Sequence, residues 1–420
     1  MIAGYEGAGE WDFRGADTKE YTHCFHIYPA MMIPQIARGL IELYGKRGGL
    51  LFDPYCGTGT SLVEARLAGM DAAGTDLNPT ARLIALAKTI DYDIKNLRGE
   101  VDSFLEGLEE RLQSIENYNG FPDPEFVTFD RLEDWFPVKS IGEIHVCMDS
   151  IETIADEKAR LFLRIALSEC LRLVSYQRNR EFKLYRIAEV ERGEFYVPLF
   201  PLLEARIRRN LEGCKAFSEA VDPSTSAAIH GFNTVEESGL AKLGRNPDLV
   251  VTSPPYGDSG TTVAYAQFSW LTNIWLGLDS RSGALDRELM GGRKEEVVKF
   301  GFGPLDDAIK TISEASPKRA KEVMHFYYEY LQSMSNVAKI VAEGGHTCYV
   351  VGNRTVKGVQ LPTDQFTAWA FEQFDFSHVV TYVRDIPNKR MPSKNSPSNV
   401  TGETAPTMSG EFLVVCRKSK

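Results

Sequence analysis

The tetrapeptide Ser253-Pro254-Pro255-Tyr256 is the stretch of this sequence best suited to chemistry. It follows the mostly apolar run 248–252, which predicts a buried strand. Two consecutive prolines end that strand, because neither has an N–H to donate and each ring fixes φ. The sequence therefore predicts a stiff corner that presents a hydroxyl, backbone carbonyls and an aromatic ring at the carboxyl edge of a sheet, where ligands bind in open α/β folds.

A glycine-rich turn forms a second constellation. Gly57 and Gly59 follow a predicted strand (50–53) and precede a predicted helix. Residues without a Cβ reach positive φ and let a ligand approach the backbone. Asp76 ends the next predicted strand, and an acid at that point of such a fold accepts hydrogen bonds from ribose hydroxyls. The turn lacks GxGxxG and GK[ST], so it favours neither a nicotinamide site nor an ATP site.

Together these stretches resemble a known family. Residues 53–60 (DPYCGTGT) and 76–79 (DLNP) are similar to the S-adenosylmethionine site of class I methyltransferases, and SPPY resembles the catalytic motif of DNA amino-methyltransferases. The resemblance covers most of 25–90, 227–275 and 319–418. It implies S-adenosylmethionine as the cofactor, held by Asp53, Pro54, Cys56, Gly57, Gly59, Thr60, Asp76 and Leu77, and by Tyr28 from a segment that closes over the methionine end.

The resemblance also implies roles for the SPPY residues. An exocyclic amine is a poor nucleophile, so its two N–H bonds need acceptors and its nitrogen must be placed in line with the methyl group. In the family, the groups matching Ser253 and the carbonyl of Pro254 accept those bonds, Pro255 stiffens the corner, and Tyr256 stacks on a base rotated out of the duplex. This chemistry needs no metal, and no metal site is expected.

The implied function is a site-specific DNA methyltransferase. Serine at position 253 resembles the cytosine-N4 branch more than the adenine-N6 branch, and the adenine-N6 reading stays open. Enzymes of this family commonly act beside a restriction endonuclease, which is the implied partner together with double-stranded DNA.

Two other readings remain. Transfer-RNA guanosine-N2 methyltransferases carry a similar pair of motifs, but usually after a long RNA-binding domain, whereas 51 residues precede Phe52 here. A non-catalytic, cofactor-bound subunit is the alternative from another class, and the two intact motifs count against it.

The alternation of predicted strands and helices indicates how these motifs are positioned. It predicts a doubly wound α/β fold of the class I methyltransferase type, with a mostly parallel sheet, a C-terminal antiparallel hairpin and a helical insert. The two ends of the insert must return to neighbouring points on the sheet. The expected parts are 21–92 (cofactor-binding half), 93–225 (helical insert) and 226–420 (catalytic half, with loops at 280–318 and 387–409).

The composition is that of an ordinary globular protein, with 43% hydrophobic and 25% charged residues. Seven scattered cysteines without CxxC spacing favour neither disulfides nor zinc, and a reducing cytoplasm is expected. No stretch approaches the roughly 18 apolar residues of a membrane span, and no basic-then-apolar leader begins the chain, so no membrane association is expected.

The net charge of −11 argues against a general polyanion binder, but basic residues cluster locally. We expect the insert to form one wall of a DNA cleft, with Arg206, Arg208 and Arg209 on phosphates. A second basic cluster, in the loop before the last strand, is also a candidate for phosphate contacts: Arg384, Lys389, Arg390 and Lys394.

Overall fold

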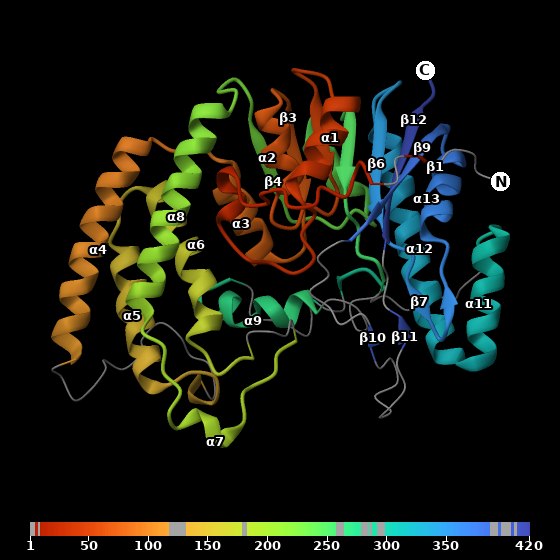
Figure 1. The fold of residues 1–420 in the computed structure, drawn as a ribbon. Helices are drawn as coiled ribbons and strands as arrows, with labels where there is room; N and C mark the ends of the chain where they lie inside the picture. Colours follow the sequence, from red (N-terminus) through yellow and green to blue (C-terminus); the bar gives the residue numbers. More distant parts are fainter. Residues whose placement is uncertain are drawn as a thin grey trace.

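One eight-stranded sheet forms the centre of the computed structural model (Figure 1). Its order is β1-β9-β12-β6-β5-β2-β3-β4, and only the pairs that β12 forms with β6 and β9 are antiparallel. The strands are β1 (Tyr5–Glu6), β2 (Leu50–Asp53), β3 (Asp71–Thr75), β4 (Ala227–His230), β5 (Leu249–Thr252), β6 (His346–Val351), β9 (Phe376–Asp385) and β12 (Gly410–Lys418). The predicted class I methyltransferase-like sheet, with its antiparallel C-terminal hairpin, is confirmed.

The structure describes residues 5–6, 9–116, 132–178, 183–257, 264–278, 285, 288–291, 299–386, 394–395, 405–406 and 410–420. The predicted phosphate ligands Lys389 and Arg390 lie outside these residues, as does most of the loop 387–409.

Helices cover both faces of the sheet, which explains why the central strands β2 and β5 are buried throughout. Successive strand residues point to opposite faces. Leu51 packs in a core with α1 (Pro34–Tyr44) and α2 (Thr60–Leu67), whereas Phe52 packs in a second core with α12 (Pro317–Ile340) and α13 (Thr363–Glu372).

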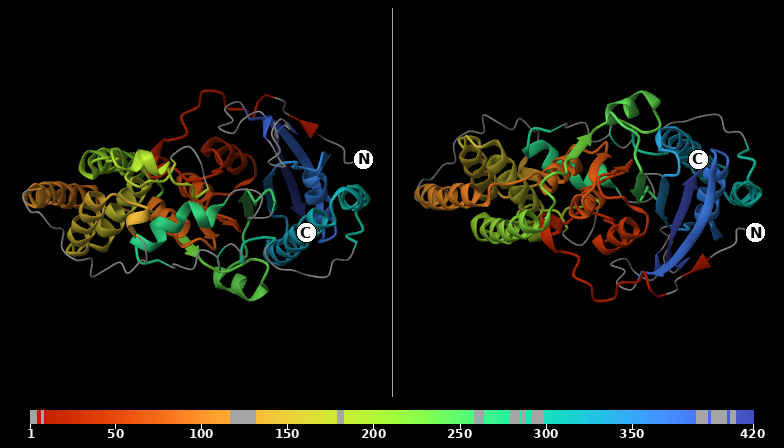
Figure 2. Two further views of the ribbon diagram at one scale, coloured as in Figure 1. Left: turned by 90° about the horizontal axis from the view of Figure 1, so that it is seen from below. Right: turned by 90° about the horizontal axis from the view of Figure 1, so that it is seen from above.

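A block of helices lies between α3 (Pro79–Thr89) and β4 and projects beyond the β4 end of the sheet (Figures 1 and 2). Its own core joins it to α3 and to α9 (Tyr265–Trp275), where Leu271 and Trp275 are buried one helical turn apart. The helices of the block are α4 (Ile94–Glu116), α5 (Val138–Glu152), α6 (Glu157–Leu173), α7 (Glu189–Arg192) and α8 (Leu199–Ala220).

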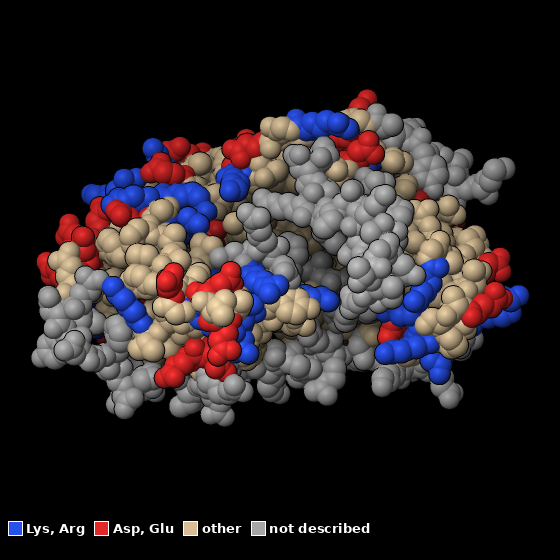
Figure 3. Space-filling view, turned by 60° about the horizontal axis from the view of Figure 1, so that its bottom comes forward, with Lys and Arg blue, Asp and Glu red and all other residues tan. Residues whose placement is uncertain are grey.

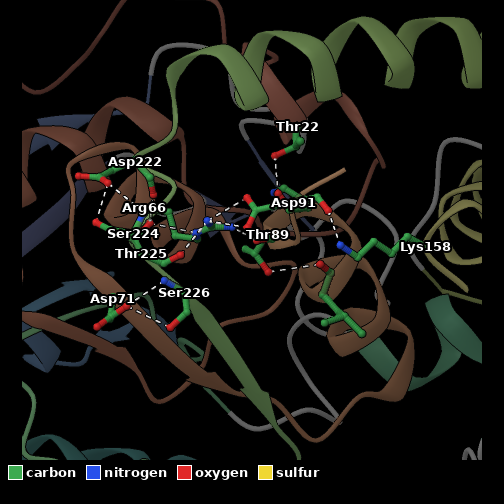
Figure 4. A network of polar contacts seen from close by, with 12 residues as sticks. Thr22, Arg66, Asp71, Thr89, Asp91, Lys158, Asp222, Ser224, Thr225 and Ser226 are labelled. Carbon is green, nitrogen blue, oxygen red and sulfur yellow. Dashed lines mark hydrogen bonds and ion pairs between the residues drawn. The ribbon is translucent and has the colours of Figure 1, made fainter. Parts of the chain in front are cut away.

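One buried arginine of α2 fastens both ends of this helical block (Figure 4). The guanidinium of Arg66 donates to the carbonyl of Thr89 and to Asp91 Oδ1 (2.9 Å), just before the block. It also donates to the carbonyl of Thr225 (2.9 Å), just after it. Lys158 of α6 donates from Nζ to the carbonyl of Asp91 (2.7 Å). The two ends therefore meet at one point beside the sheet, as expected for an insert.

One expectation about an irregular segment is wrong. Within the predicted loop 280–318, Gly303–Ala315 forms helix α11, because Leu305 and Ile312 belong to an apolar face that packs in the same core as α12. At the start of the chain, the two residues of β1 pair parallel with β9. The remaining elements are η1 (Tyr21–Cys24), η2 (Leu132–Asp134), η3 (Glu237–Leu243), β7 (Thr355–Val356), β8 (Val359–Gln360), β10 (Lys394–Asn395) and β11 (Ala405–Pro406).

All seven cysteines are buried and have free thiols, as their spacing predicts. Within the described ranges, no helix combines the length and the apolar character needed to cross a bilayer. The same ranges contain no group of three or more His, Cys, Asp or Glu side chains arranged to hold a metal ion.

Candidate active site

A pocket of about 960 Å³, counting its open mouth, lies at the carboxyl ends of β2, β3, β4 and β5. This side of the molecule is hollowed near its middle (Figure 3). Of the residues predicted to hold a cofactor or act on a substrate, these line the pocket: Tyr28, Asp53, Pro54, Cys56, Gly57, Thr60, Asp76, Leu77, Ser253 and Pro255. The tertiary structure thus brings the two sequence motifs to one cavity.

Asp53 joins the two motifs at the floor of this pocket. Its Oδ1 accepts hydrogen bonds from Thr252 Oγ1 (2.5 Å) and from the Tyr55 N–H (3.0 Å), and its Oδ2 accepts from the hydroxyl of Ser61. Burial raises the pKa of Asp53 to about 6, because the hydrogen bonds only partly offset the cost of removing a carboxylate from water. The end of β2 is therefore tied to the residue that precedes SPPY.

The two glycines of the turn, Gly57 and Gly59, have different surroundings. Gly57 has φ 49°, lines the pocket, and an added Cβ there would meet no atom within 4 Å. Gly59, with φ 78°, precedes α2, and an added Cβ would lie 3.0 Å from the Cβ of Ala85 in α3. Gly59 is not among the lining residues, so its predicted role changes: it lets the turn reverse and α3 approach.

Cys56 is buried within this turn, and burial raises the pKa of its thiol well above the usual value. The thiol therefore packs rather than reacts.

Asp76 is fastened to the same turn. Its Oδ2 accepts from the N–H of Gly57 (3.1 Å), and its Oδ1 accepts from the N–H of Asn78 (2.7 Å). Burial raises the pKa of Asp76, although these backbone hydrogen bonds and the charge of Arg82 act in the opposite direction. A carboxylate has about four acceptor positions, so further acceptor capacity remains at the pocket wall.

A pair of tyrosines closes one side of the pocket. The rings of Tyr28 and Tyr265 are nearly parallel, at 20°, with centroids 5.9 Å apart. Asn78 Nδ2 donates to the hydroxyl of Tyr28 (2.7 Å) and to Ser269 Oγ (2.8 Å). Asn78 therefore docks α9, which follows the SPPY corner, onto the cofactor-binding half of the sheet.

The SPPY corner is tied to the C-terminal strands. Ser253 and Pro255 line the pocket, whereas Pro254 is buried and Tyr256 is half-buried, and neither is a lining residue. The hydroxyl of Tyr256 donates to Glu411 Oε1 (2.8 Å) of β12. Burial raises the pKa of the Tyr256 hydroxyl well above the usual value. The ring is thus held from its hydroxyl end beside the pocket rather than within its wall.

Sequence reasoning missed part of the lining. Phe232, Asn233 and Thr234 follow β4 and stand at the same edge as the motifs. Extending the rule that ligands bind at the carboxyl ends of parallel strands to every predicted strand would have found them. Leu289 and Met290 also line the pocket, but no pattern in the sequence predicts this position for them.

The phosphate roles expected for Arg206 and Arg209 are not supported, because both side chains pair internally. Arg206 Nε lies 3.2 Å and Arg209 Nη2 2.6 Å from Oε2 of Glu169, whose side chain is only 4% exposed. Arg209 also donates to the carbonyl of Phe25 (3.2 Å). Arg208, 60% exposed, pairs with Glu204 along α8. Arg206 and Arg209, three residues apart, lie on the same face of α8 and share Glu169, whereas Arg208 lies on another face.

The phosphate role expected for Arg384 is also not supported. Its side chain is only 6% exposed and pairs with Glu411, so it is not available for phosphates.

The comparisons with known proteins agree with this geometry. The profile of a family described as RMKL-like, methyltransferase domain, matches residues 19–102. Type II methyltransferase M.MvaI of Kocuria varians is 35% identical over 96% of this chain and 93% of its own length. Type II methyltransferase M.MjaII of Methanocaldococcus jannaschii is 34% identical over 21% of this chain and 18% of its own length. The tRNA (guanine(10)-N2)-dimethyltransferase of Methanothermobacter thermautotrophicus is 44% identical over 12% of this chain and 16% of its own length.

The similarity to M.MvaI extends through the glycine turn, the helical block and the SPPY corner, because it spans nearly the whole chain. With both motifs gathered at one pocket of a class I sheet, the chain belongs to the DNA methyltransferase family, among Type II methyltransferases such as M.MvaI.

Proposed function

We propose that this protein transfers a methyl group from S-adenosylmethionine to the exocyclic N4 amine of a cytosine that is rotated out of duplex DNA at a specific sequence. The observation that carries the proposal is the shared pocket, because Ser253 lines the same cavity as Gly57 and Asp76. Asp53 and Thr252 hold these two sides together. A methyl donor and an acceptor base must meet in this way, with the reacting atoms aligned.

The residues of the pocket fit S-adenosylmethionine. Gly57 leaves open space where any other residue would project a Cβ, as a close ligand requires. Asp76 retains acceptor capacity for ribose hydroxyls, and the side chains of Leu77 and Phe232 offer apolar faces for an adenine ring. Asp53 supplies a carboxylate for the ammonium group of the methionine moiety.

The chain's own residues then act on the base. S-adenosylmethionine supplies an electrophilic methyl group on a positively charged sulfur. The Ser253 hydroxyl and the Pro254 carbonyl accept the N–H bonds of the target amine, which draws its lone pair out of the ring system. Pro254 and Pro255 keep this corner rigid. Tyr256, held by Glu411, supplies the face beside which the rotated base stacks.

DNA is favoured over RNA as the substrate by the extent of the similarities. M.MvaI matches 96% of this chain, including the helical block, whereas the tRNA enzyme matches 12%. Cytosine is favoured over adenine by the serine at position 253. A cognate restriction endonuclease that acts on the same sequence is the partner we propose.

We propose the helical block 93–225 as the region that contacts DNA beside the pocket, and 21–92 and 226–420 as the two halves of one catalytic domain. The location of the helical block supports its assignment to DNA contact. Helix α9, whose first residue Tyr265 lines the pocket, packs against both the block and α3. The proposed DNA contacts of the block do not include Arg206 and Arg209, since both side chains pair with Glu169.

The test is methyl transfer from radiolabelled S-adenosylmethionine to three substrates: duplex DNA of mixed sequence, single-stranded DNA and bulk tRNA. We expect label in duplex DNA, and N4-methylcytosine after digestion to nucleosides. N6-methyladenine in the digest would move the protein to the adenine branch. Label in tRNA alone would contradict the proposal.

A further inference from the structure

The hydroxyl groups of Ser253 and Tyr256 begin a chain of contacts that ends on a buried ion pair. Ser253 Oγ lies 3.3 Å from Tyr256 Oη. Tyr256 Oη lies 2.8 Å from Glu411 Oε1, and Glu411 Oε2 lies 3.2 Å from Arg384 Nη1. The Glu411 carboxylate thus bridges the SPPY corner and β9, with one oxygen committed to each.

The position of the ion pair follows from the sheet. Arg384 of β9 and Glu411 of β12 stand directly opposite each other in the antiparallel register, so their side chains share one face. Their side chains are 6% and 16% exposed, respectively. A guanidinium can only donate hydrogen bonds, so Glu411 accepts from Arg384, and a carboxylate has acceptor positions only. Glu411 is therefore an acceptor without a proton to donate.

This arrangement sets the direction of every hydrogen bond in the chain. A tyrosine hydroxyl has a single proton, and Tyr256 donates it to the carboxylate of Glu411. Tyr256 Oη then has only lone pairs to offer Ser253, so the bond between the two hydroxyls uses the proton of Ser253. The lone pairs of Ser253 Oγ remain, and Ser253 lines the pocket.

We propose that Arg384 and Glu411 are positioning residues that commit the Ser253 proton to Tyr256 and so make Ser253 an acceptor for the N–H of the target amine. This inference rests on the proposed function. Without Glu411, Tyr256 can donate its proton to Ser253 instead, and the Ser253 proton then turns toward the amine. That orientation opposes the hydrogen bond that activates the nucleophile.

The experiment compares Glu411→Ala, Tyr256→Phe and the double variant with the wild type. Tyr256→Phe keeps the ring for stacking and removes the hydroxyl alone. Each single variant should lower kcat about 10- to 30-fold, as expected for a hydrogen bond to a charged group. The Michaelis constant for DNA and the dissociation constant of S-adenosylmethionine should stay within about twofold. Because both changes break one chain of hydrogen bonds, the double variant should be no slower than either single variant.

Glu343→Ala, an exposed carboxylate in the turn before β6, is the matched control and should behave as the wild type.

Two results would overturn the inference alone: a kcat for Glu411→Ala equal to that of an active wild type, or losses from Glu411→Ala and Tyr256→Phe that multiply in the double variant. Multiplied losses would mean that Glu411 supports the fold around the site independently of the Tyr256 hydroxyl. A wild type inactive on duplex DNA would instead contradict the proposed function.

An additional variant guards against unfolding. If Glu411→Ala leaves Arg384 unpaired and the protein does not fold, Arg384→Met with Glu411→Met replaces the ion pair by apolar side chains of similar length, a change that buried pairs often tolerate. This variant should show the same loss of kcat as Tyr256→Phe. A wild-type kcat in the folded variant would overturn the inference.

Discussion

Thr252 at the end of β5 donates its hydroxyl proton to Asp53 at the end of β2, with 2.5 Å between the oxygens. Both side chains are buried, and they come from positions far apart in the chain. Asp53 belongs to the stretch that carries the glycine turn, and Thr252 directly precedes the SPPY corner. This one contact holds the proposed methyl-donor side and the proposed acceptor side of the pocket at a fixed separation.

Asp53 should make stability depend on pH. Its pKa is about 6 in the folded protein and near 3.8 in the unfolded chain, so the unfolded chain ionises first as pH rises. Its contribution to stability therefore falls between about pH 4 and pH 6 and is constant above. Relative to Asp53→Asn, the wild type should lose roughly 2 kcal/mol of unfolding free energy between pH 4.5 and 7, measured by urea denaturation. Parallel pH profiles for the two proteins would contradict the raised pKa.

Asp76→Ala should weaken S-adenosylmethionine binding by about 1.5–3 kcal/mol, as expected for the loss of a charge-assisted hydrogen bond. The variant also loses the acceptors of the Gly57 and Asn78 N–H groups, so its folding must be checked by thermal unfolding. Isothermal titration calorimetry is the measurement, and Asp307→Ala on the exposed surface of α11 is the control. Unchanged affinity would place the ribose elsewhere in the pocket.

Tyr256→Ala should spare cofactor binding and reduce methylation, because the rotated base loses a stacking partner worth roughly 1–3 kcal/mol. Steady-state methylation of duplex DNA measures the loss, and Tyr328→Ala on α12, where the tyrosine is 39% exposed, is the control. Wild-type turnover by Tyr256→Ala would remove the proposed stacking role.

Arg66→Met should destabilise the protein by about 2–4 kcal/mol, because the carbonyls of Thr89 and Thr225 lose a buried donor. The block should then separate from the sheet more easily, which limited proteolysis between α3 and β4 would detect. The control is Arg245→Met, whose half-exposed ion pair with Asp71 should contribute no more than about 1 kcal/mol. Equal stability of the two variants would argue against a fastening role for Arg66.

The arginines of α8 should separate into two classes. Arg206→Ala combined with Arg209→Ala should lower stability by about 2–4 kcal/mol, because Glu169 is left buried and unpaired. Arg208→Ala should leave the stability nearly unchanged and reduce the salt slope of DNA binding by at most about one unit. Thermal unfolding and fluorescence anisotropy at several salt concentrations check these outcomes. A stable double variant with a flattened salt slope would restore the original phosphate roles.

Local features of the sequence determined the class of the fold and the identity of the two motifs. A buried strand followed by two prolines, and a glycine turn between a strand and a helix, are each encoded by neighbouring residues. The spacing of Leu305 and Ile312 also encodes α11, although glycines and charges around it obscured the pattern.

Only the tertiary structure decided which charged groups are free and which are partnered. Arg206 and Arg209 stand out in the sequence as basic residues, but Glu169, from a different helix, uses their charge. Arg384 likewise meets Glu411 only because β12 pairs with β9. Such pairs join residues distant in the chain, and the energy that favours them depends on burial that no local pattern specifies. The same holds for Asp53 and Thr252, whose contact exists because β2 and β5 are neighbours in the sheet.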